Sequence, residues 1–442
     1  MNNNSVAIKK FLILTTSKKI NAWCFYDWAN SAFATTIMAA VLPIFFREVA
    51  TIHLDASQHH LATSLWGYTA AVAMLFVSFI SLIFGPVSDF SSSKKKFLKY
   101  FIIVGVFATA LLSLTGFGMW KLVSLLFIVG NIGYAGSEVF YNALLPHISP
   151  PDKIDRISTR GYAFGYIGGG LLLMVNMSMI WFLPKTSFSL HHTDIPLLGM
   201  QLSFLSVAVW WGLFSLPILR YVPEPPGPHT SLQGINPFTI ANRRLKKTFS
   251  HIKKYKQLFL LLIAFWLYND GIGTIIKMAT AYGNEIGIGT LDLVGALLLV
   301  QIVGIPCSFA FGRLAEIIST KKSILLGLMV YLLIAIGGFF MTKAIHFWIL
   351  AFMVGLVQGG TQGLSRSLYG SMVPKEKSAE FFSFYNISGK FAGIAGPVVF
   401  ALISQLFRSS RFGIISLVFF FIAGAVLLTR VDVEEGRKMA KL

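Results

Sequence analysis

Charged side chains are scarce in this chain: only 12% of its 442 residues are Asp, Glu, Lys or Arg, whereas 55% are hydrophobic and the mean hydropathy is +0.69. Soluble domains carry roughly 25% charged residues, so this shortage excludes a soluble enzyme, a disordered chain and a collagen. At about 20 apolar residues per spanning helix, the length accommodates about a dozen spans. The composition predicts an all-α polytopic membrane protein.

Cysteine is nearly absent as well. The two cysteines, Cys24 and Cys307, both lie in apolar segments, so we expect neither a disulfide nor a cysteine-based metal site. The sequence has no Gly-x-x-x-x-Gly-Lys-Ser/Thr phosphate loop and no Gly-x-Ser-x-Gly nucleophile motif. We therefore expect a protein that is not an enzyme and that binds no cofactor and no metal.

Acidic residues are half as frequent as basic ones, with 18 Asp and Glu against 37 Lys and Arg. We attribute this excess to the positive-inside rule and expect no nucleic-acid partner. With the N-terminus inside, 28 of the basic residues fall in or beside cytoplasmic loops and 6 on the opposite side. The sequence predicts a protein of the cytoplasmic (inner) membrane with both termini in the cytoplasm. The predicted spans are 21–46, 62–86, 97–118, 122–146, 160–183, 198–220, 257–281, 291–313, 323–342, 345–373, 381–407 and 412–429.

A proline-rich and then basic stretch divides the spans six and six. Pro223, Pro225, Pro226 and Pro228 indicate a stiff spacer, and the following basic stretch predicts a linker helix lying on anionic headgroups. The predicted parts are an N-terminal segment 1–20, a six-helix bundle 21–222, the linker 223–256, a second bundle 257–430 and a tail 431–442.

The two halves repeat each other at a nearly constant offset. Gly85-x-x-x-Asp89 with Lys94–Lys96 matches Gly312-x-x-x-Glu316 with Lys321 and Lys322, so that glycine, acid and base all recur at one and the same offset. Glycines spaced along 161–168 recur with the same spacing along 389–396. Parallel six-helix repeats form one class of secondary transporter, whose site lies between the halves.

The loop signature Gly-x-x-x-Asp-(x4)-Lys-Lys resembles that of the major facilitator superfamily, which implies twelve transmembrane helices in two six-helix repeats and a monomer. An acid at the C-terminal end of a helix is stabilised only by a cation or another helix N-terminus. We therefore expect gate contacts at Asp89, Lys94, Lys95 and Glu316. The alternative is that these residues only cap and flank helix ends.

Further stretches look like the "unknown major facilitator" family, which is related to the fungal vacuole amino-acid effluxer. The resemblance spans nearly the whole chain, with small departures at Gly363 and Ser383. It implies the fold and leaves the substrate open. The stretches are 23–33 (WCFYDWANSAF), 268–271 (YNDG), 359–367 (GGTQGLSRS) and 380–385 (EFFSFY).

Ionisable groups inside a span are functional candidates by default, and six residues stand out in the predicted spans. They are Asp27, Glu138, Asp270, Lys277, Arg366 and Lys390. Glu138 and Arg366 occupy corresponding positions of the repeat, each eight residues before a proline. We expect them to meet as a cytoplasmic gate, or, alternatively, each to pair within its own half.

Asp27 and Asp270 occupy corresponding places on spans one and seven, which line the central cavity in this superfamily. Either carboxylate can carry a proton or hold a substrate ammonium, and Lys277 or Lys390 can meet a substrate carboxylate. Opposite charges across a cavity suit a zwitterion; internal salt bridges such as Asp270 with Lys390 are the alternative. The polar neighbours assigned to the site are Tyr26, Asn30, Tyr268, Asn269, Gln358 and Gln362.

The sequence therefore predicts a secondary transporter of a small polar or zwitterionic metabolite, such as an amino acid, coupled to protons and working by alternating access. One alternative is a transporter or flippase of a lipid-like amphiphile. A second alternative is a membrane sensor or intramembrane enzyme that does not transport.

Overall fold

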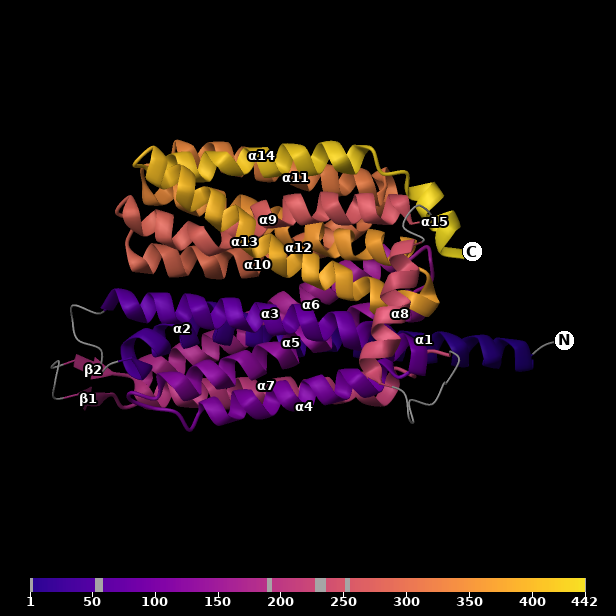
Figure 1. The fold of residues 1–442 in the computed structure, drawn as a ribbon, viewed down its shortest axis with the longest axis horizontal. Coiled ribbons are helices and arrows are strands. Elements are labelled where there is room, and N and C mark those ends of the chain that lie inside the picture. The colour runs from indigo at the N-terminus through magenta and orange to yellow at the C-terminus, as the bar shows by residue number, and fades with distance from the viewer. Residues whose placement is uncertain (1–2, 52–58, 189–192, 227–235, 251–254, 442) are drawn as a thin grey trace. The chain divides into compact units, whose positions relative to one another are not determined.

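Long apolar helices make up nearly all of the computed structural model, which describes residues 3–51, 59–188, 193–226, 236–250 and 255–441 (Figure 1). Each predicted span after the first overlaps one of these helices. The long helices after the first span are α3 (His59–Ser91), α4 (Lys94–Leu112), α5 (Trp120–Ile148), α6 (Ile154–Phe182), α7 (Leu197–Tyr221), α9 (Lys256–Glu285), α10 (Thr290–Ile318), α11 (Thr320–Phe339), α12 (Ala344–Met372), α13 (Ser378–Leu406) and α14 (Ser410–Thr429).

Ten segments of the described chain are long and apolar enough to cross a membrane. The other two predicted spans correspond to α4, whose first six residues include four lysines, and to α13, of which Ala395–Leu406 is a shorter apolar piece. The prediction of an all-α membrane protein is confirmed.

The first span is the least regular. It runs through α1 (Asn3–Ala32), the π-helix η1 (Phe33–Ala40), α2 (Val41–Phe45) and the π-helix η2 (Phe46–Ala50). Pro43 lies in α2, between the two wide segments, and its missing amide hydrogen and ring displace the usual i→i−4 bonding. The π-helix η1 begins three residues after Asn30, which the sequence assigns to the site, and π-segments occur often at functional sites.

A small hairpin joins α6 to α7. Strand β1 (Thr186–Phe188) pairs antiparallel with β2 (Thr193–Ile195), with Thr186 opposite Ile195. The sequence did not predict these strands. Because each strand has only three residues, the fold class remains all-α.

The chain forms two compact units. The first comprises Met1–Ser81, Ser93–Tyr141 and Phe164–Pro226. In it, α7 contacts both α1 and α4. Aromatic rings fill its core: Phe33 stacks on Tyr134 at 5.2 Å between centroids, and Trp211 lies 5.5 Å from Phe33.

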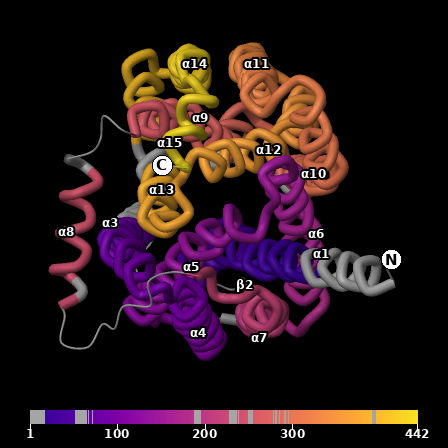
Figure 2. Tube along the Cα trace, turned by 90° about the vertical axis from the view of Figure 1, so that its right-hand side faces the viewer, coloured from indigo at the N-terminus to yellow at the C-terminus, as the bar shows by residue number. Residues whose placement is uncertain are grey.

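The second unit comprises Leu82–Ser92, Asn142–Ala163 and Gly227–Leu442. Helix α9 contacts α13 and α14, while α11 contacts α12 and α14 (Figure 2). The ends of α3, α5 and α6 belong to this unit because they pack on helices of the C-terminal half. The predicted division of the chain into two six-helix bundles is based on the sequence repeat, whereas these two units are defined by contacts. The predicted division therefore stays a prediction.

Two shorter helices complete the second unit. The linker contains α8 (Pro237–Ser250), and the tail forms α15 (Val433–Lys441). Helix α15 contacts α9 and α12, and its buried Gly436 lies directly against the side chain of Met372. Arg437 Nε also donates to Ser371 Oγ at 3.3 Å.

Candidate functional site

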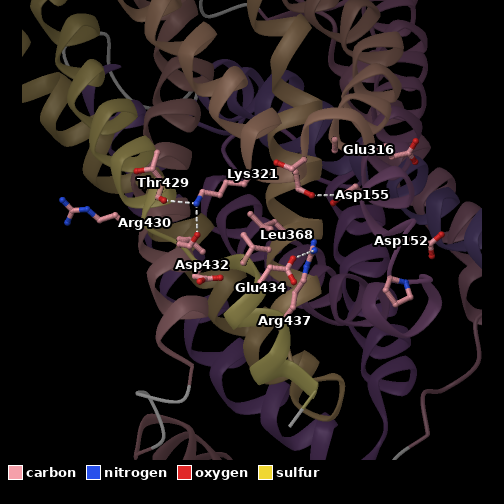
Figure 3. A pocket seen from close by; sticks show the side chains of 16 residues that line it. Asp152, Asp155, Glu316, Lys321, Leu368, Thr429, Arg430, Asp432, Glu434 and Arg437 are labelled. Carbon is pink, nitrogen blue, oxygen red and sulfur yellow. Dashed lines mark hydrogen bonds and ion pairs between the residues drawn. The ribbon is translucent and has the colours of Figure 1, made fainter.

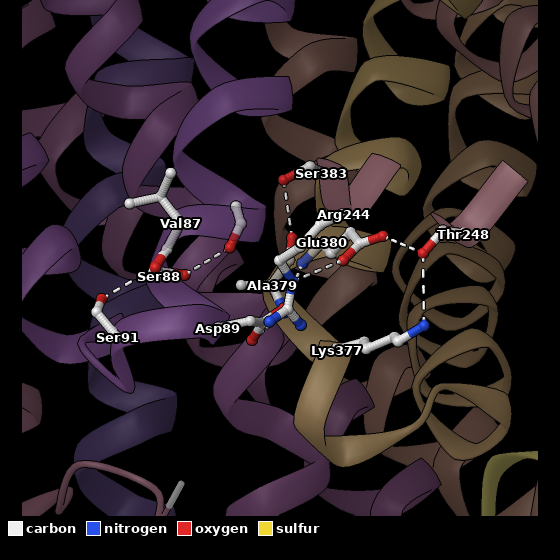
Figure 4. Close-up of polar contacts among 11 residues, drawn as sticks. Val87, Ser88, Asp89, Ser91, Arg244, Thr248, Lys377, Ala379, Glu380 and Ser383 are labelled. Carbon is white, nitrogen blue, oxygen red and sulfur yellow. Dashed lines mark hydrogen bonds and ion pairs between the residues drawn. The ribbon is translucent and has the colours of Figure 1, made fainter. Parts of the chain in front are cut away.

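The acid of the first motif copy lies against a helix N-terminus. Asp89, which is 3% exposed, accepts the amide hydrogens of Ala379 at 3.2 Å and Glu380 at 2.8 Å, both in the first turn of α13 (Figure 4). The carboxylate thus meets two amides that have no partner within their own helix, and the positive end of the helix dipole favours its charge. This contact joins the end of α3 to the start of α13.

The motif glycines allow close helix contacts in both copies. A Cβ on Gly85 would stand 2.7 Å from the carbonyl oxygen of Ala379 and against the hydroxyl of Ser383. A Cβ on Gly312 would meet the hydroxyl of Thr159 on α6. Each motif glycine therefore permits the end of one helix to approach the start of a helix from the other half of the sequence.

The loops after these glycines share an uncommon backbone conformation. Ser92 has φ 49° and Ser319 has φ 89°, and each serine follows the acid of its motif copy at the same spacing. Non-glycine residues rarely adopt positive φ. The repeat inferred from glycine, acid and base therefore extends to the backbone of the turn.

The acids of the two copies differ. Glu316 is exposed on the wall of a cavity of about 670 Å³ in the second unit (Figure 3), whereas Asp89 is buried. In that wall Asp155, from the first turn of α6, accepts hydrogen bonds from Thr320 Oγ1 at 2.6 Å and Ser367 Oγ at 2.5 Å. Asp155, rather than Glu316, therefore joins α6 to α11 and α12.

The predicted motif lysines begin α4. Lys94 is buried, and the amide of Lys95 donates to Glu224 at 2.9 Å, so an acid from beyond α7 caps α4. These residues belong to the first unit and Asp89 to the second. A gate contact between Asp89 and the lysines stays a prediction.

Arg366 is the centre of a buried polar cluster. The side chain is 3% exposed; its Nε donates to Ser158 Oγ at 2.9 Å, and Nη2 donates to the carbonyl of Ser158 at 2.7 Å. Nη1 reaches Asn142 Oδ1 at 3.3 Å, and the guanidinium lies 4.5 Å from the ring centre of Tyr162. Ser158 also donates to the carbonyl of Gly363 at 2.7 Å. A rigid fork of donors suits this arrangement, which ties α12 to the ends of α5 and α6.

The start of α13 also binds the linker. Glu380 is fully buried and accepts from Arg244 Nε at 3.3 Å and from the hydroxyl of Thr248 (Figure 4). Lys377 Nζ lies 3.5 Å from that hydroxyl and 5.3 Å from the ring centre of Tyr255. Asp89 thus binds the backbone of the first turn of α13, and α8 binds the side chain of Glu380 in the same turn.

Buried polar residues of the first unit gather where α1 crosses α5. Asp27, 8% exposed, accepts the hydroxyl of Tyr141 at 2.7 Å. Tyr26 donates to Ser137 Oγ at 2.6 Å. Two amides on the same helices are also buried. Asn30 Nδ2, one turn after Tyr26 on α1, and Asn131 Oδ1, six residues before Ser137 on α5, have no hydrogen-bond partner among the described residues. An amide donor and an amide acceptor thus remain in this region.

Glu138 belongs to the same region. Tyr134, one turn earlier on α5, donates to Glu138 Oε1 at 3.2 Å. Glu138 lies in the first unit and Arg366 in the second, so their predicted meeting as a gate stays a prediction.

The second unit holds a matching carboxylate. Asp270, 1% exposed, accepts the amide hydrogen of Gly396 at 2.8 Å. A Cβ on Gly396 would stand 2.8 Å from Asp270 Oδ1, so only glycine permits this approach. The repeat-related Gly168 lies as closely on α1, where an added Cβ would be 2.8 Å from the Cα of Trp28. In each half, therefore, the helix that carries the acid packs closely against a glycine at the corresponding position of the repeat.

The remaining predicted site residues are placed as follows. Tyr268 is buried and shares a 2.6 Å hydrogen bond with Ser365. Asn269, Gln358 and Gln362 are half-buried. The side chains of Lys277 and Lys390 lie outside the described part of the structure, so their roles stay predictions.

Sequence reasoning did not assign a site role to Glu380, Asp155 or Ser158. For the two acids a signal exists, because each stands in the first turn of a helix, where a carboxylate is favoured. For Ser158 no signal exists, because its importance comes from a partner that is distant in the sequence, on α12.

Comparisons with known proteins agree with this architecture. A family model described as vacuole effluxer Atg22 like matches residues 15–441. A Bacillus subtilis (strain 168) protein named an uncharacterized MFS-type transporter, YxiO, is 37% identical over 430 residues, covering 96% of this chain and 97% of that protein. Autophagy-related protein 22 of Saccharomyces cerevisiae is 22% identical over 526 residues, covering 100% of this chain and 96% of that protein.

Solved structures show the fold. The human organic anion transporter MFSD10 has a TM-score of 0.71 at 13% identity, covering 93% of this chain and 99% of that one. The proton:xylose symporter XylE has a TM-score of 0.67 at 14% identity, covering 94% of this chain and 95% of that one. The predicted major facilitator fold is confirmed.

Proposed function

The chain belongs to the family of Atg22-like vacuole effluxers, and we propose that it carries a small polar or zwitterionic metabolite of the amino-acid class. It is a secondary transporter of the major facilitator superfamily, related to proteins named as transporters and effluxers, and it is not an enzyme. The substrate and the coupling to protons are the proposal.

The contacts at the start of α13 and around Arg366 support alternating access. Asp89, from the N-terminal half of the sequence, accepts two amide hydrogens of α13, and Arg366, from the C-terminal half, donates to Ser158 of α6. These contacts are polar and non-covalent, so they can form in one state and break in another. A cluster of this kind is suited to close one end of a transport path.

The charges within the spans support a zwitterionic substrate. Asp27 and Asp270 are buried carboxylates in corresponding places of the two repeats. A charge buried in a span is costly, and a substrate ammonium or an exchangeable proton would neutralise it. We propose that one of the two carboxylates carries the proton.

The distribution of the basic residues supports a proposed placement in the membrane. With 28 Lys and Arg in or beside the loops assigned to the cytoplasm, we propose an inner-membrane protein with both termini inside. The unit of transport is proposed to be the monomer.

The proposal is tested by counterflow in proteoliposomes preloaded with amino acids, dipeptides, sugars and organic acids, with exchange measured by mass spectrometry. We expect exchange of an amino acid that Asp270→Asn abolishes. Asp292→Asn is the matched control, because Asp292 stands in the first turn of α10 and accepts from Trp348; it should exchange normally. Exchange of sugars or organic acids only, or no exchange by folded protein, would overturn the proposed substrate class.

A further inference from the structure

Helix α8 has one face that is occupied by the protein. Ile240, Ala241, Arg244 and Thr248 share this face and are buried or largely buried. Arg244 and Thr248 both bind the carboxylate of Glu380, which is itself fully buried (Figure 4). The face is therefore fixed to the first turn of α13.

A second side of α8 is exposed and cationic. Arg243, Lys246 and Lys247 are all exposed, and their spacings of three and four residues place them together. No acidic residue occurs between 237 and 250. This face carries three cations over little more than one turn of helix.

The connections of α8 hold it near the bilayer surface. Five residues separate Ser250 from Lys256, where the spanning helix α9 begins, and a chain of that length reaches at most about 20 Å. The layer next to the end of a spanning helix is the layer of lipid headgroups. We propose that the exposed face of α8 binds anionic phospholipid headgroups of the membrane surface.

Headgroup binding would act on the first turn of α13 as well. Lipid attracted to Arg243, Lys246 and Lys247 leaves Arg244 on the other face, bound to Glu380. The amide of Glu380 is also one of the two donors to Asp89. The linker would thus connect the charge of the membrane surface to the turn at which α3 and α13 meet.

The test uses the full-length protein in detergent and does not depend on transport. Dioleoylphosphatidylglycerol is titrated and its binding is measured by native mass spectrometry, with dioleoylphosphatidylcholine as the zwitterionic reference. Each basic side chain near an anionic surface strengthens binding about five-fold. Replacing Arg243, Lys246 and Lys247 by Gln should therefore weaken phosphatidylglycerol binding roughly a hundred-fold, and salt should weaken it in the wild type.

A matched variant removes the same charge elsewhere. Lys375, Lys438 and Lys441 are exposed and lie outside α8, and their replacement by Gln should leave phosphatidylglycerol binding unchanged. Arg244→Gln should also retain it, because that side chain faces Glu380. Wild-type binding by the α8 variant, or equal losses in the two triple variants, would overturn the proposal.

Discussion

Gly85→Ala tests whether close packing of α3 on α13 holds the cluster together. The new Cβ would stand 2.7 Å from the carbonyl oxygen of Ala379. Ordinary carbon–oxygen contacts begin near about 3.4 Å, so the helices must separate by about 0.7 Å. Ser383, which the Cβ also meets, can rotate away, whereas the carbonyl belongs to the backbone and cannot. A separation of this size affects the neighbouring capping contact.

The same separation would lengthen the bond from the Glu380 amide to Asp89, now 2.8 Å, to about 3.5 Å, beyond good hydrogen-bonding distance. Overpacking costs about 1–3 kcal/mol, and loss of a cap costs about 1 kcal/mol. The higher helix propensity of alanine returns about 1 kcal/mol. The net cost of about 1–3 kcal/mol corresponds to roughly five- to 150-fold more frequent opening.

Hydrogen exchange measured by mass spectrometry reports this opening directly, because the amides of Ala379 and Glu380 are the donors to Asp89. We expect the peptide that covers the first turn of α13 to exchange roughly five- to 150-fold faster in Gly85→Ala. Gly273→Ala is the control, since a Cβ there meets nothing within 4 Å. Wild-type exchange in Gly85→Ala would refute the packing argument.

Three further predictions concern turns, pH and the gate. Ser319 has φ 89° and ψ 151°, a region that favours glycine, so Ser319→Gly should stabilise the protein by about 1 kcal/mol and raise its melting temperature in detergent. Ser92→Gly should have a smaller effect. A lower melting temperature of Ser319→Gly would contradict backbone strain at this residue. Burial raises the pKa of Glu224 above its usual range, so the stability of the protein should fall as pH rises from about 4.5 through the folded pKa. Melting temperatures of Glu224→Gln should lack this fall. The same pH dependence in the variant and the wild type would contradict the role of Glu224. Reversing the charge of Glu138 or of Arg366 should impair counterflow and reversing both should partly restore it, whereas additive losses would argue against a gate.

Predictions from sequence succeeded where the signal is local. Apolar segments of about 20 residues located all ten of the candidate spanning helices of the described residues, because in a bilayer the backbone must satisfy its own hydrogen bonds. The repeat was visible in Gly85 and Gly312, since close helix approach requires glycine in each half. The hairpin between α6 and α7 was missed, because two three-residue strands leave almost no periodic pattern.

Long-range partners were decided by the tertiary structure alone. The sequence by itself determined that Asp89 needs a cation or a helix N-terminus, because it ends a helix whose dipole disfavours it. Only the fold decided that this partner is the first turn of α13, in the other half of the sequence, and that Glu380 holds the linker. It also decided that Asp155, and not the motif acid Glu316, joins α6 to α12. The physical reason is that hydropathy and helix signals act within one element, whereas these contacts depend on which helix ends pack together.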